Sequence, residues 1–302
     1  MSELEKILAK WRNEDWTELE AFSRATYVSE APVVVIGGCA RSGTTLLRVM
    51  LDSHSAVTCG VPSNVFVPTA IDAKELAFRF EFSEHLVWQM QQASADRAEF
   101  IDKFRMLCEA STGKAIWGDK TARNVHQFKW IRQHFPKALL IHVIRDARDT
   151  ACSLRTHRKR RVIGSTIELT GNVLPLNECV QRWVRDVNVG IAMRGDPRYI
   201  EVKYEDVVRD SEAVLRVVCE KIGITFEKQM LDYYMVSGPS RDVLKFPQNI
   251  EATKPMYSTS VGRWRRDLTP EELSTVLHDA TPLLELLGYA PYDSGKETQD
   301  QA

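Results

Sequence analysis

The segment Pro32–Leu51, PVVVIGGCARSGTTLLRVML, constrains the fold more than any other part of the chain. It begins with a β-branched apolar run that is typical of a strand buried on both faces of a parallel sheet. A glycine-bearing turn follows, and the apolar residues after Thr45 recur at helical spacing. A strand, a turn and a helix in this order leave backbone N–H groups free at the positive end of a helix dipole. This segment therefore predicts an anion-binding loop.

The loop differs from the nucleotide P-loop that its glycines suggest. Gly38 and Gly43 have the separation found in G-x-x-x-x-G-K-[ST], but Thr44 stands where that motif has its lysine. Without that lysine, magnesium-dependent triphosphate chemistry is disfavoured. Arg41 with the hydroxyls of Thr44 and Thr45 instead suits a smaller anionic group bound without a metal. The alternative is an ordinary turn in which Gly-Thr-Thr caps a helix.

Further strand and helix patterns alternate after this opening unit. A short strand pattern over 114–120 ends in a polar turn at Lys120, a buried strand pattern covers 138–144, and a helical pattern follows each. This order predicts an α/β fold, a P-loop-like doubly wound parallel sheet flanked by helices. The sequence also predicts a strand at 199–203 and helices within 72–112 and at 177–193, 211–222 and 226–235. A last helical stretch has an apolar stripe from Leu273 to Leu287, and Pro282 should break or kink it.

The domain organisation follows from where these patterns stop. We expect a helical lead-in over 1–30, a single domain over 31–292 and a disordered tail over 293–302. The strongly basic run at 155–162 predicts a solvated helix face or loop. The residues up to 176 have turn-forming composition and predict a surface excursion.

Composition narrows the partners and the compartment. The formal net charge of −1 over 302 residues gives no overall basis for binding nucleic acid. The six cysteines are scattered without a CxxC pair, which predicts buried free thiols in a reducing compartment and no metal site. No signal-peptide core and no apolar run of membrane-spanning length is evident, so a cytoplasmic protein is expected.

A second anion site is predicted where the strand at 138–144 ends. Arg145 follows this strand directly and Ser153 lies eight residues further on. Ligands of open α/β sheets bind at the carboxyl ends of the strands, where an arginine and a hydroxyl can hold a phosphate. Two alternatives stay open from the residues alone. Arg145 and Asp146 can form an ion pair at a helix start, or Asp146 can hold magnesium at the end of a Walker-B strand.

Together these segments resemble the sulfotransferases that use 3′-phosphoadenosine 5′-phosphosulfate (PAPS). The residues from Arg41 to Thr45 are similar to the 5′-phosphosulfate loop of that family, and Arg145 and Ser153 to its 3′-phosphate motif. Within the family, RSGTTLLRVMLDSHSAVTCG is most similar to the first motif of the tyrosylprotein type. The likeness runs in patches from about Pro32 to Tyr292.

The resemblance implies roles for individual residues. Lys120 stands at the position of a catalytic lysine of the tyrosylprotein type, and Tyr204 at that of a tyrosine that contacts the ligand. With PAPS as donor and no metal, the expected catalytic residues are Arg41, Lys120, Thr44 and His54. The expected donor-binding residues are Arg41, Ser42, Gly43, Thr44, Thr45, Arg145, Ser153, Tyr204, Lys254 and Arg263.

One departure from the family concerns the general base. The tyrosylprotein enzymes have two glutamates directly after the Cys-Gly pair, and the second one accepts the proton of the acceptor. Here these positions hold Val61 and Pro62, neither of which can accept a proton. Candidate replacements are His54, Asp119, His126 and His157, and a purely structural role for His54 is an alternative.

The resulting hypothesis is a cytosolic enzyme that moves a sulfuryl group from PAPS to a hydroxyl or similar nucleophile. The expected acceptor is a small molecule, a glycan or lipid precursor, or a cytosolic peptide, in preference to a secretory protein tyrosine. We expect neither a nucleic-acid partner nor a membrane span, and a homodimer is possible. The alternatives are a P-loop kinase or NTPase, and a protein that binds PAPS or its product without turnover.

Overall fold

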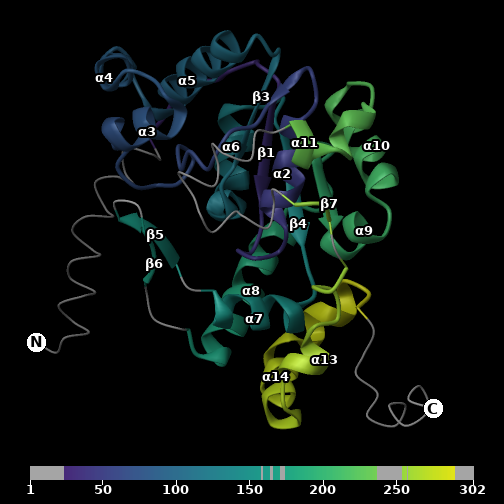
Figure 1. The fold of residues 1–302 in the computed structure, drawn as a ribbon. Helices are drawn as coiled ribbons and strands as arrows, with labels where there is room; N and C mark the ends of the chain where they lie inside the picture. Colours follow the sequence, from purple (N-terminus) through teal and green to yellow (C-terminus); the bar gives the residue numbers. More distant parts are fainter. Residues whose placement is uncertain are drawn as a thin grey trace, which may run out of the picture.

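The apolar run after Pro32 forms β1 (Val33–Gly37), the middle strand of a five-stranded parallel sheet (Figure 1). The strand order is β2-β3-β1-β4-β7, and every neighbouring pair is parallel. The other four strands are β2 (Val57–Thr58), β3 (Ile116–Lys120), β4 (Leu139–Ile144) and β7 (Tyr199–Lys203). The predicted α/β fold with a parallel sheet is confirmed.

The computed structural model describes residues 24–157, 159–163, 166–170, 174–236, 254–256 and 258–289. Helices connect the strands and cover the sheet on both faces, as a parallel sheet requires. They are α2 (Thr44–Asp52), α3 (Ala73–Phe80), α4 (Glu84–Gln92), α5 (Arg97–Thr112), η1 (Ala122–Gln127), α6 (Phe128–His134), α7 (Ala147–Thr156), α8 (Leu176–Ile191), α9 (Tyr204–Arg209), α10 (Ser211–Ile222), η2 (Lys228–Met230), α11 (Tyr233–Val236), α13 (Trp264–Asp267) and α14 (Pro270–Leu286).

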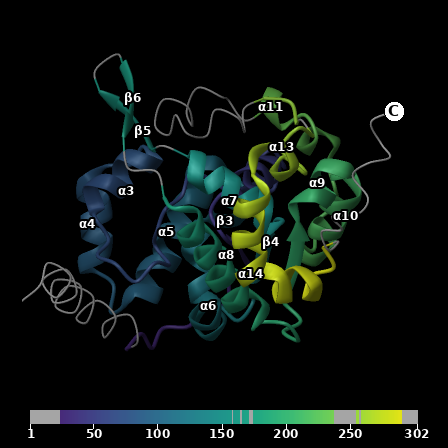
Figure 2. The same cartoon turned by 90° about the horizontal axis from the view of Figure 1, so that it is seen from below.

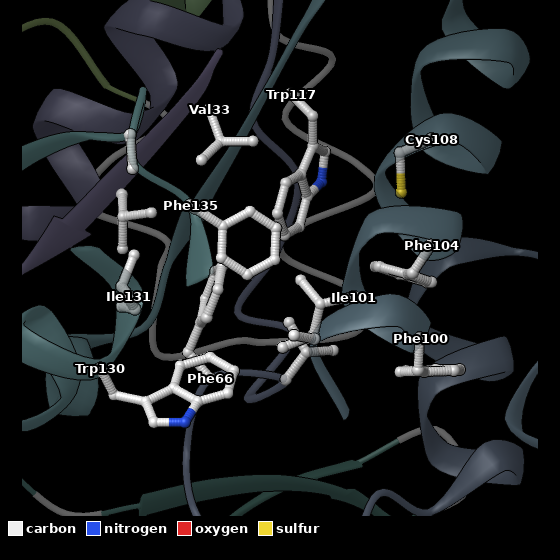
Figure 3. Close-up of a cluster of buried hydrophobic side chains, with 14 of the residues drawn as sticks. Val33, Phe66, Phe100, Ile101, Phe104, Cys108, Trp117, Trp130, Ile131 and Phe135 are labelled. Carbon is white, nitrogen blue, oxygen red and sulfur yellow. The ribbon is translucent and has the colours of Figure 1, made fainter. Parts of the chain in front are cut away.

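Alternate residues of β1 belong to two different cores, because side chains of a strand point to opposite faces of the sheet. Val33 and Val35 lie in a cluster with Trp117 and the aromatic side chains of α5 and α6, which Figure 3 shows. Val34 and Ile36 lie in a second cluster with apolar residues of α2 and α10. β1 is thus buried on both faces, as its continuous apolar run predicts.

A third cluster joins the sheet to α7, α8 and α14. Ile144 at the end of β4 and Cys39 in the loop after β1 pack with Trp183 of α8 and Val276 of α14. Figure 2 shows α14 lying across α7 and α8. The cluster fixes α7 and α8 directly beside the carboxyl ends of β1 and β4.

The basic run and the excursion after it form an antiparallel hairpin, so the predicted helix face or loop is wrong. β5 (Lys159–Ile163) pairs with β6 (Thr166–Thr170) in a separate two-stranded sheet, which Figure 2 shows standing away from the central one. A Gly-Ser pair between two β-branched runs was the available signal for this hairpin.

Three other predictions about helices need correction. α14 runs through Pro282 as one helix, because its apolar residues on both sides of the proline pack into the third cluster. Residues 24–27 lie outside any helix, and residues 1–23 of the expected lead-in lie outside the described residues. The 226–235 segment forms η2 and α11, two short pieces, rather than one helix.

The six cysteines are free and buried, which confirms that part of the prediction. The tail at 293–302 lies outside the described residues, and the division into lead-in, domain and tail stays a prediction. Within the described ranges, no helix combines the length and the apolar character needed to cross a bilayer.

Replacing Gly190 by alanine tests the packing of α8 on the sheet. A Cβ at this position would lie closer than 3.0 Å to the ring of His142, which is fully buried in β4. We expect Gly190→Ala to lower the free energy of unfolding by about 2 kcal/mol, despite the better helix propensity of alanine. Urea unfolding measures this change.

Asn188→Ala is the matched control, because it places an alanine at an exposed position of the same helix. This variant should change the free energy of unfolding by less than about 0.5 kcal/mol. A Gly190→Ala protein as stable as wild type would show that α8 can move away from His142 at no cost.

Candidate active site

The parallel sheet brings four separate segments together at one edge. β1, β3, β4 and β7 end at Gly37, Lys120, Ile144 and Lys203, so all four carboxyl ends meet there. The residues that follow β1, β4 and β7 are the glycine-bearing loop, Arg145 and Tyr204. Residues predicted from distant parts of the sequence therefore lie around one site.

The loop between β1 and α2 needs unusual backbone angles. Gly43 has φ of 92°, and a Cβ there would lie closer than 3.0 Å to the ring of Tyr204. Arg41 also has a positive φ, 73°, which costs a bulky residue about 1 kcal/mol or more. Such strain is typical of binding loops whose surroundings hold them in one conformation.

The N-terminus of α2 is open to an anion. Gly43 is its N-cap residue and supplies no side-chain hydrogen bond, and the first turn contains no acidic residue. The Ser42 hydroxyl is fully buried and has no hydrogen-bond partner among the described residues. Free backbone N–H groups and an unused hydroxyl at a helix N-terminus suit a phosphate or sulfate group.

Two arginines converge beside this loop. Arg41 Nε donates a hydrogen bond of 3.1 Å to Ser153 Oγ on α7. Arg145 Nη1 donates to the Arg41 carbonyl at 3.1 Å, Nη2 donates to the Ser260 carbonyl, and the guanidinium lies 4.7 Å from the centre of the Tyr204 ring. Arg145 Nε is buried without a partner in the described part of the chain. A continuous series of contacts thus joins four predicted site residues, Ser153, Arg41, Arg145 and Tyr204.

Lys120 approaches the same loop from the end of β3. Its Nζ donates a hydrogen bond of 3.2 Å to Thr45 Oγ1 in the first turn of α2, and no ion pair to it occurs in the described ranges. Burial, followed by the charge of Arg48, lowers the pKa of Lys120 to about 7. Arg48 is itself buried in α2 and donates to the Cys59 carbonyl at 3.4 Å.

A C-terminal segment, residues 258–264, closes one side of the site. The Asp149 carboxylate in α7 accepts backbone hydrogen bonds from Gly262 at 2.7 Å and Trp264 at 3.0 Å. The hydroxyls of Tyr204 and Ser260 are 2.6 Å apart. Asp149 thereby fixes the segment whose Ser260 carbonyl holds Arg145.

The two remaining predicted donor residues lie at the ends of this region. Arg263 forms an ion pair with Asp267 in α13, with Nη2 and Oδ2 2.6 Å apart, and its charge also reaches Cys152 in α7. Lys254 is exposed, and its carbonyl accepts a hydrogen bond of 2.7 Å from the Tyr233 hydroxyl. The contacts of these two residues indicate a role in donor binding less clearly than those of Arg41 and Arg145 do.

His54 lies away from the site, and the structure contradicts its proposed role as general base. It follows the C-terminus of α2, about 13 Å along the helix from the loop. Its Nε2 lies 2.8 Å from the Thr225 carbonyl, to which it donates, and its Nδ1 accepts from the Ala56 amide at 2.9 Å. Both ring nitrogens are occupied, so His54 has the structural role weighed as its alternative.

The other three base candidates differ in their surroundings. The Asp119 carboxylate is buried and accepts hydrogen bonds from the Ser63 hydroxyl, the Ser63 amide and the Asn124 side chain. His157 ends α7. His126, in η1, is paired with Asp186 of α8 at 2.9 Å.

Sequence reasoning missed Arg48, Asp149, Asp186 and Ser260. Arg48 carried an available signal, since it is a charged residue within an otherwise apolar helical pattern, where burial demands a partner. Ser260 lies in a segment without periodicity, and nothing in the sequence distinguishes it. In the described part of the chain, no group of three or more His, Cys, Asp or Glu side chains could hold a metal ion. The absence of a metal from the reaction stays a prediction.

Curated proteins of similar sequence align with most of this chain. Protein-tyrosine sulfotransferase A of Caenorhabditis elegans is 25% identical over 279 residues, which cover 88% of this chain and 69% of the relative. The protein-tyrosine sulfotransferase of Drosophila melanogaster is 25% identical over 281 residues, and the match covers 88% of this chain and 53% of that protein.

Solved structures share the fold. The sulfotransferase domain of the Synechococcus PCC 7002 olefin synthase has a TM-score of 0.66 and 20% identity, covering 89% of this chain and 98% of that one. A mouse sulfotransferase in complex with 3′-phosphoadenosine 5′-phosphate (PAP) has a TM-score of 0.53 and 13% identity, and the match covers 89% of this chain and 91% of that one. At these identities the likeness establishes the fold.

The sequence model of the sulfotransferase family matches residues 32–228 of this chain. This region contains the loop, Lys120, Arg145, Ser153 and Tyr204. The predicted resemblance to the tyrosylprotein type agrees with the names of the relatives. The kinase and non-catalytic alternatives are not favoured, and the prediction of a PAPS-dependent sulfotransferase is confirmed. This chain belongs to the sulfotransferase family.

Proposed function

We propose that this sulfotransferase moves the sulfuryl group of PAPS to the phenolic hydroxyl of a tyrosine in a peptide. The observation that carries the donor half is the buried cation cluster at the N-terminus of α2, where Ser42 Oγ and Arg145 Nε lack partners among the described residues. The names of the curated relatives support the acceptor half. The cytoplasmic location and the homodimer stay predictions.

The two ends of the donor have separate groups to bind them. We assign the 5′-phosphosulfate to the loop amides of Ser42 to Thr45, and the 3′-phosphate to Arg145 and Ser153. Arg145 now holds two carbonyl oxygens, which a phosphate can replace with a stronger, charge-assisted partner. Tyr204, Lys254 and Arg263 complete the proposed donor contacts.

The reaction is an in-line displacement at sulfur. The acceptor oxygen forms a bond to sulfur while the bond from sulfur to the 5′-phosphate oxygen breaks, which leaves PAP. Negative charge builds on the leaving phosphate, and fixed positive charge in a site that excludes water stabilises it. We assign this role to Arg41 and Lys120, together with the hydroxyls of Thr44 and Thr45.

Replacing Arg145 by alanine tests the donor site. We expect Arg145→Ala to weaken PAP binding by about 3 kcal/mol, roughly 100-fold, because it removes a buried charged contact to the 3′-phosphate. Calorimetric titration with PAP and with ATP, each with and without magnesium, measures this. Arg209→Ala, which removes a largely exposed arginine on α9, should bind PAP like wild type. Magnesium-dependent binding of ATP without a response to PAP would contradict the assignment.

An acceptor panel tests the second half of the proposal. PAP release from PAPS is measured with a tyrosine peptide, with its phenylalanine and serine analogues, with small phenols and with a sugar alcohol. We expect turnover with the tyrosine peptide and none with the phenylalanine analogue. Turnover confined to small phenols or to the sugar alcohol would show that the acceptor is not a peptide.

The low pKa of Lys120 predicts that donor affinity depends on pH. An anionic ligand favours the charged ammonium, so its binding raises the pKa of Lys120 from about 7 and takes up a proton. PAP affinity should therefore be constant below about pH 7 and fall as the pH rises above it, by up to about tenfold per pH unit. Titrations from pH 6 to 9 measure this, and Lys120→Met should bind more weakly with a flatter profile. An unchanged slope in that variant would assign the proton to another group.

Asp149 should contribute to donor binding without contacting the donor. An asparagine can accept only one of the two backbone hydrogen bonds, which leaves a buried N–H group unpaired at a cost of about 1–3 kcal/mol. We expect Asp149→Asn to weaken PAP binding about tenfold because the segment carrying Ser260 loosens. Asp206→Asn on α9 is the control. Unchanged PAP affinity in Asp149→Asn would show that this segment does not order the site.

A further inference from the structure

His126 and Asp186 form a histidine–carboxylate pair beside the donor loop. His126 Nε2 lies 2.9 Å from Asp186 Oδ1, and the side chains are 28% and 6% exposed. Burial by itself raises the pKa of Asp186, but the hydrogen bond from His126 and the charges of Arg182 and Arg185 outweigh it and hold this pKa below its usual value. An ionised Asp186 that accepts the Nε2 proton leaves Nδ1 of His126 as the basic nitrogen.

The pair lies next to the loop that binds the donor. The Asp186 carboxylate lies close enough to the Cys39 thiol to raise the pKa of that thiol, and Cys39 precedes Arg41 by two residues. η1, which carries His126, directly follows the strand that ends in Lys120, and its Ala122 carbonyl accepts the Gly38 amide at 3.0 Å. The Asp186 carboxylate thus lies near both His126 and the loop, and one short helical element links His126 to Lys120.

We propose that His126, oriented by Asp186, is the general base that accepts the proton of the acceptor hydroxyl. This inference rests on the proposed function and supplies what the sequence lacks at Val61 and Pro62. His126 has a partly exposed ring and a fixed carboxylate partner, and its Nδ1 has no hydrogen-bond partner among the residues that the structure describes. Among the other candidates, His54 has no available nitrogen, and Asp119 already accepts three hydrogen bonds.

His126 takes up the proton that the acceptor hydroxyl loses in this step. As the acceptor oxygen forms its bond to sulfur, its proton moves to Nδ1, and the bond to the 5′-phosphate oxygen breaks to release PAP. The imidazolium then donates through Nε2 to the ionised Asp186, which stabilises the new positive charge. The proton leaves to solvent through the exposed part of the ring.

Other charged or titratable groups face the pair from α8, from the loop and from β4. Arg182 and Arg185 of α8 face Asp186 and stay protonated. Burial and the Asp186 carboxylate raise the pKa of the Cys39 thiol, which stays neutral. His142 of β4 is fully buried, and burial lowers its pKa to about 4.

The test compares His126→Gln with wild type on phenols of decreasing pKa. Glutamine keeps a donor for Asp186 but cannot accept the proton. At saturating PAPS we expect kcat to fall 10²- to 10⁴-fold for an unsubstituted phenol or tyrosine peptide, and much less for 4-nitrophenol, which is largely ionised at neutral pH. Asp186→Asn, a change in a positioning residue, should give a smaller loss of the same pattern. The low-pH limb of the wild-type rate profile should disappear in His126→Gln.

Donor binding and a second histidine serve as controls. PAP affinity of His126→Gln should stay within about twofold of wild type, and His278→Gln, at a fully solvated position of α14, should leave both kcat and PAP affinity unchanged. Equal losses for every acceptor, or loss of PAP binding, would show that His126 only supports the loop and would overturn the inference. PAP binding without sulfuryl transfer by wild type to any acceptor would instead overturn the proposed function itself.

Discussion

The burial of several cations around the N-terminus of α2 is the constraint on which the site depends. Lys120 and Arg145 lie at the ends of β3 and β4, the strands on either side of β1, and within the described residues neither forms an ion pair with a carboxylate. Burying uncompensated charge is costly, as the lowered pKa of Lys120 records. The protein holds these charges in place through carbonyl oxygens, hydroxyls and an aromatic ring. A bound polyanion supplies the negative charge that these buried cations lack.

The surrounding architecture keeps this arrangement rigid. α7 and α8 pack with Cys39 and Ile144 in one apolar cluster, so the loop and the start of α7 cannot move independently. The Trp183 indole donates to the Arg145 carbonyl at 2.8 Å, which fixes the arginine backbone from α8. Asp149 and Asp186 extend the same principle, since each buried carboxylate ties a separate segment to the helix that carries it.

Much of the site was predictable because its residues belong to contiguous motifs. The strand, loop and start of α2 occupy a single stretch of sequence, and Arg145 and Ser153 belong to another. His54 was misassigned because its sequence neighbourhood belongs to the first motif, while the length of α2 carries it to the opposite end of the helix. The hairpin at 159–170 was missed because the run of basic residues favoured a solvated helix face or loop. The β-branched residues on both sides of the Gly-Ser pair were the signal for two strands.

The sequence by itself determined the buried parallel strand, the uncapped anion loop and the absence of the family's glutamate at Val61 and Pro62. These features are local, because periodicity and residue type act over a few positions. Only the tertiary structure decided that Asp149 fixes the C-terminal segment and that Asp186 pairs with His126. The partners in these contacts are between 60 and 115 residues apart, and only the order of the strands in the sheet brings them together.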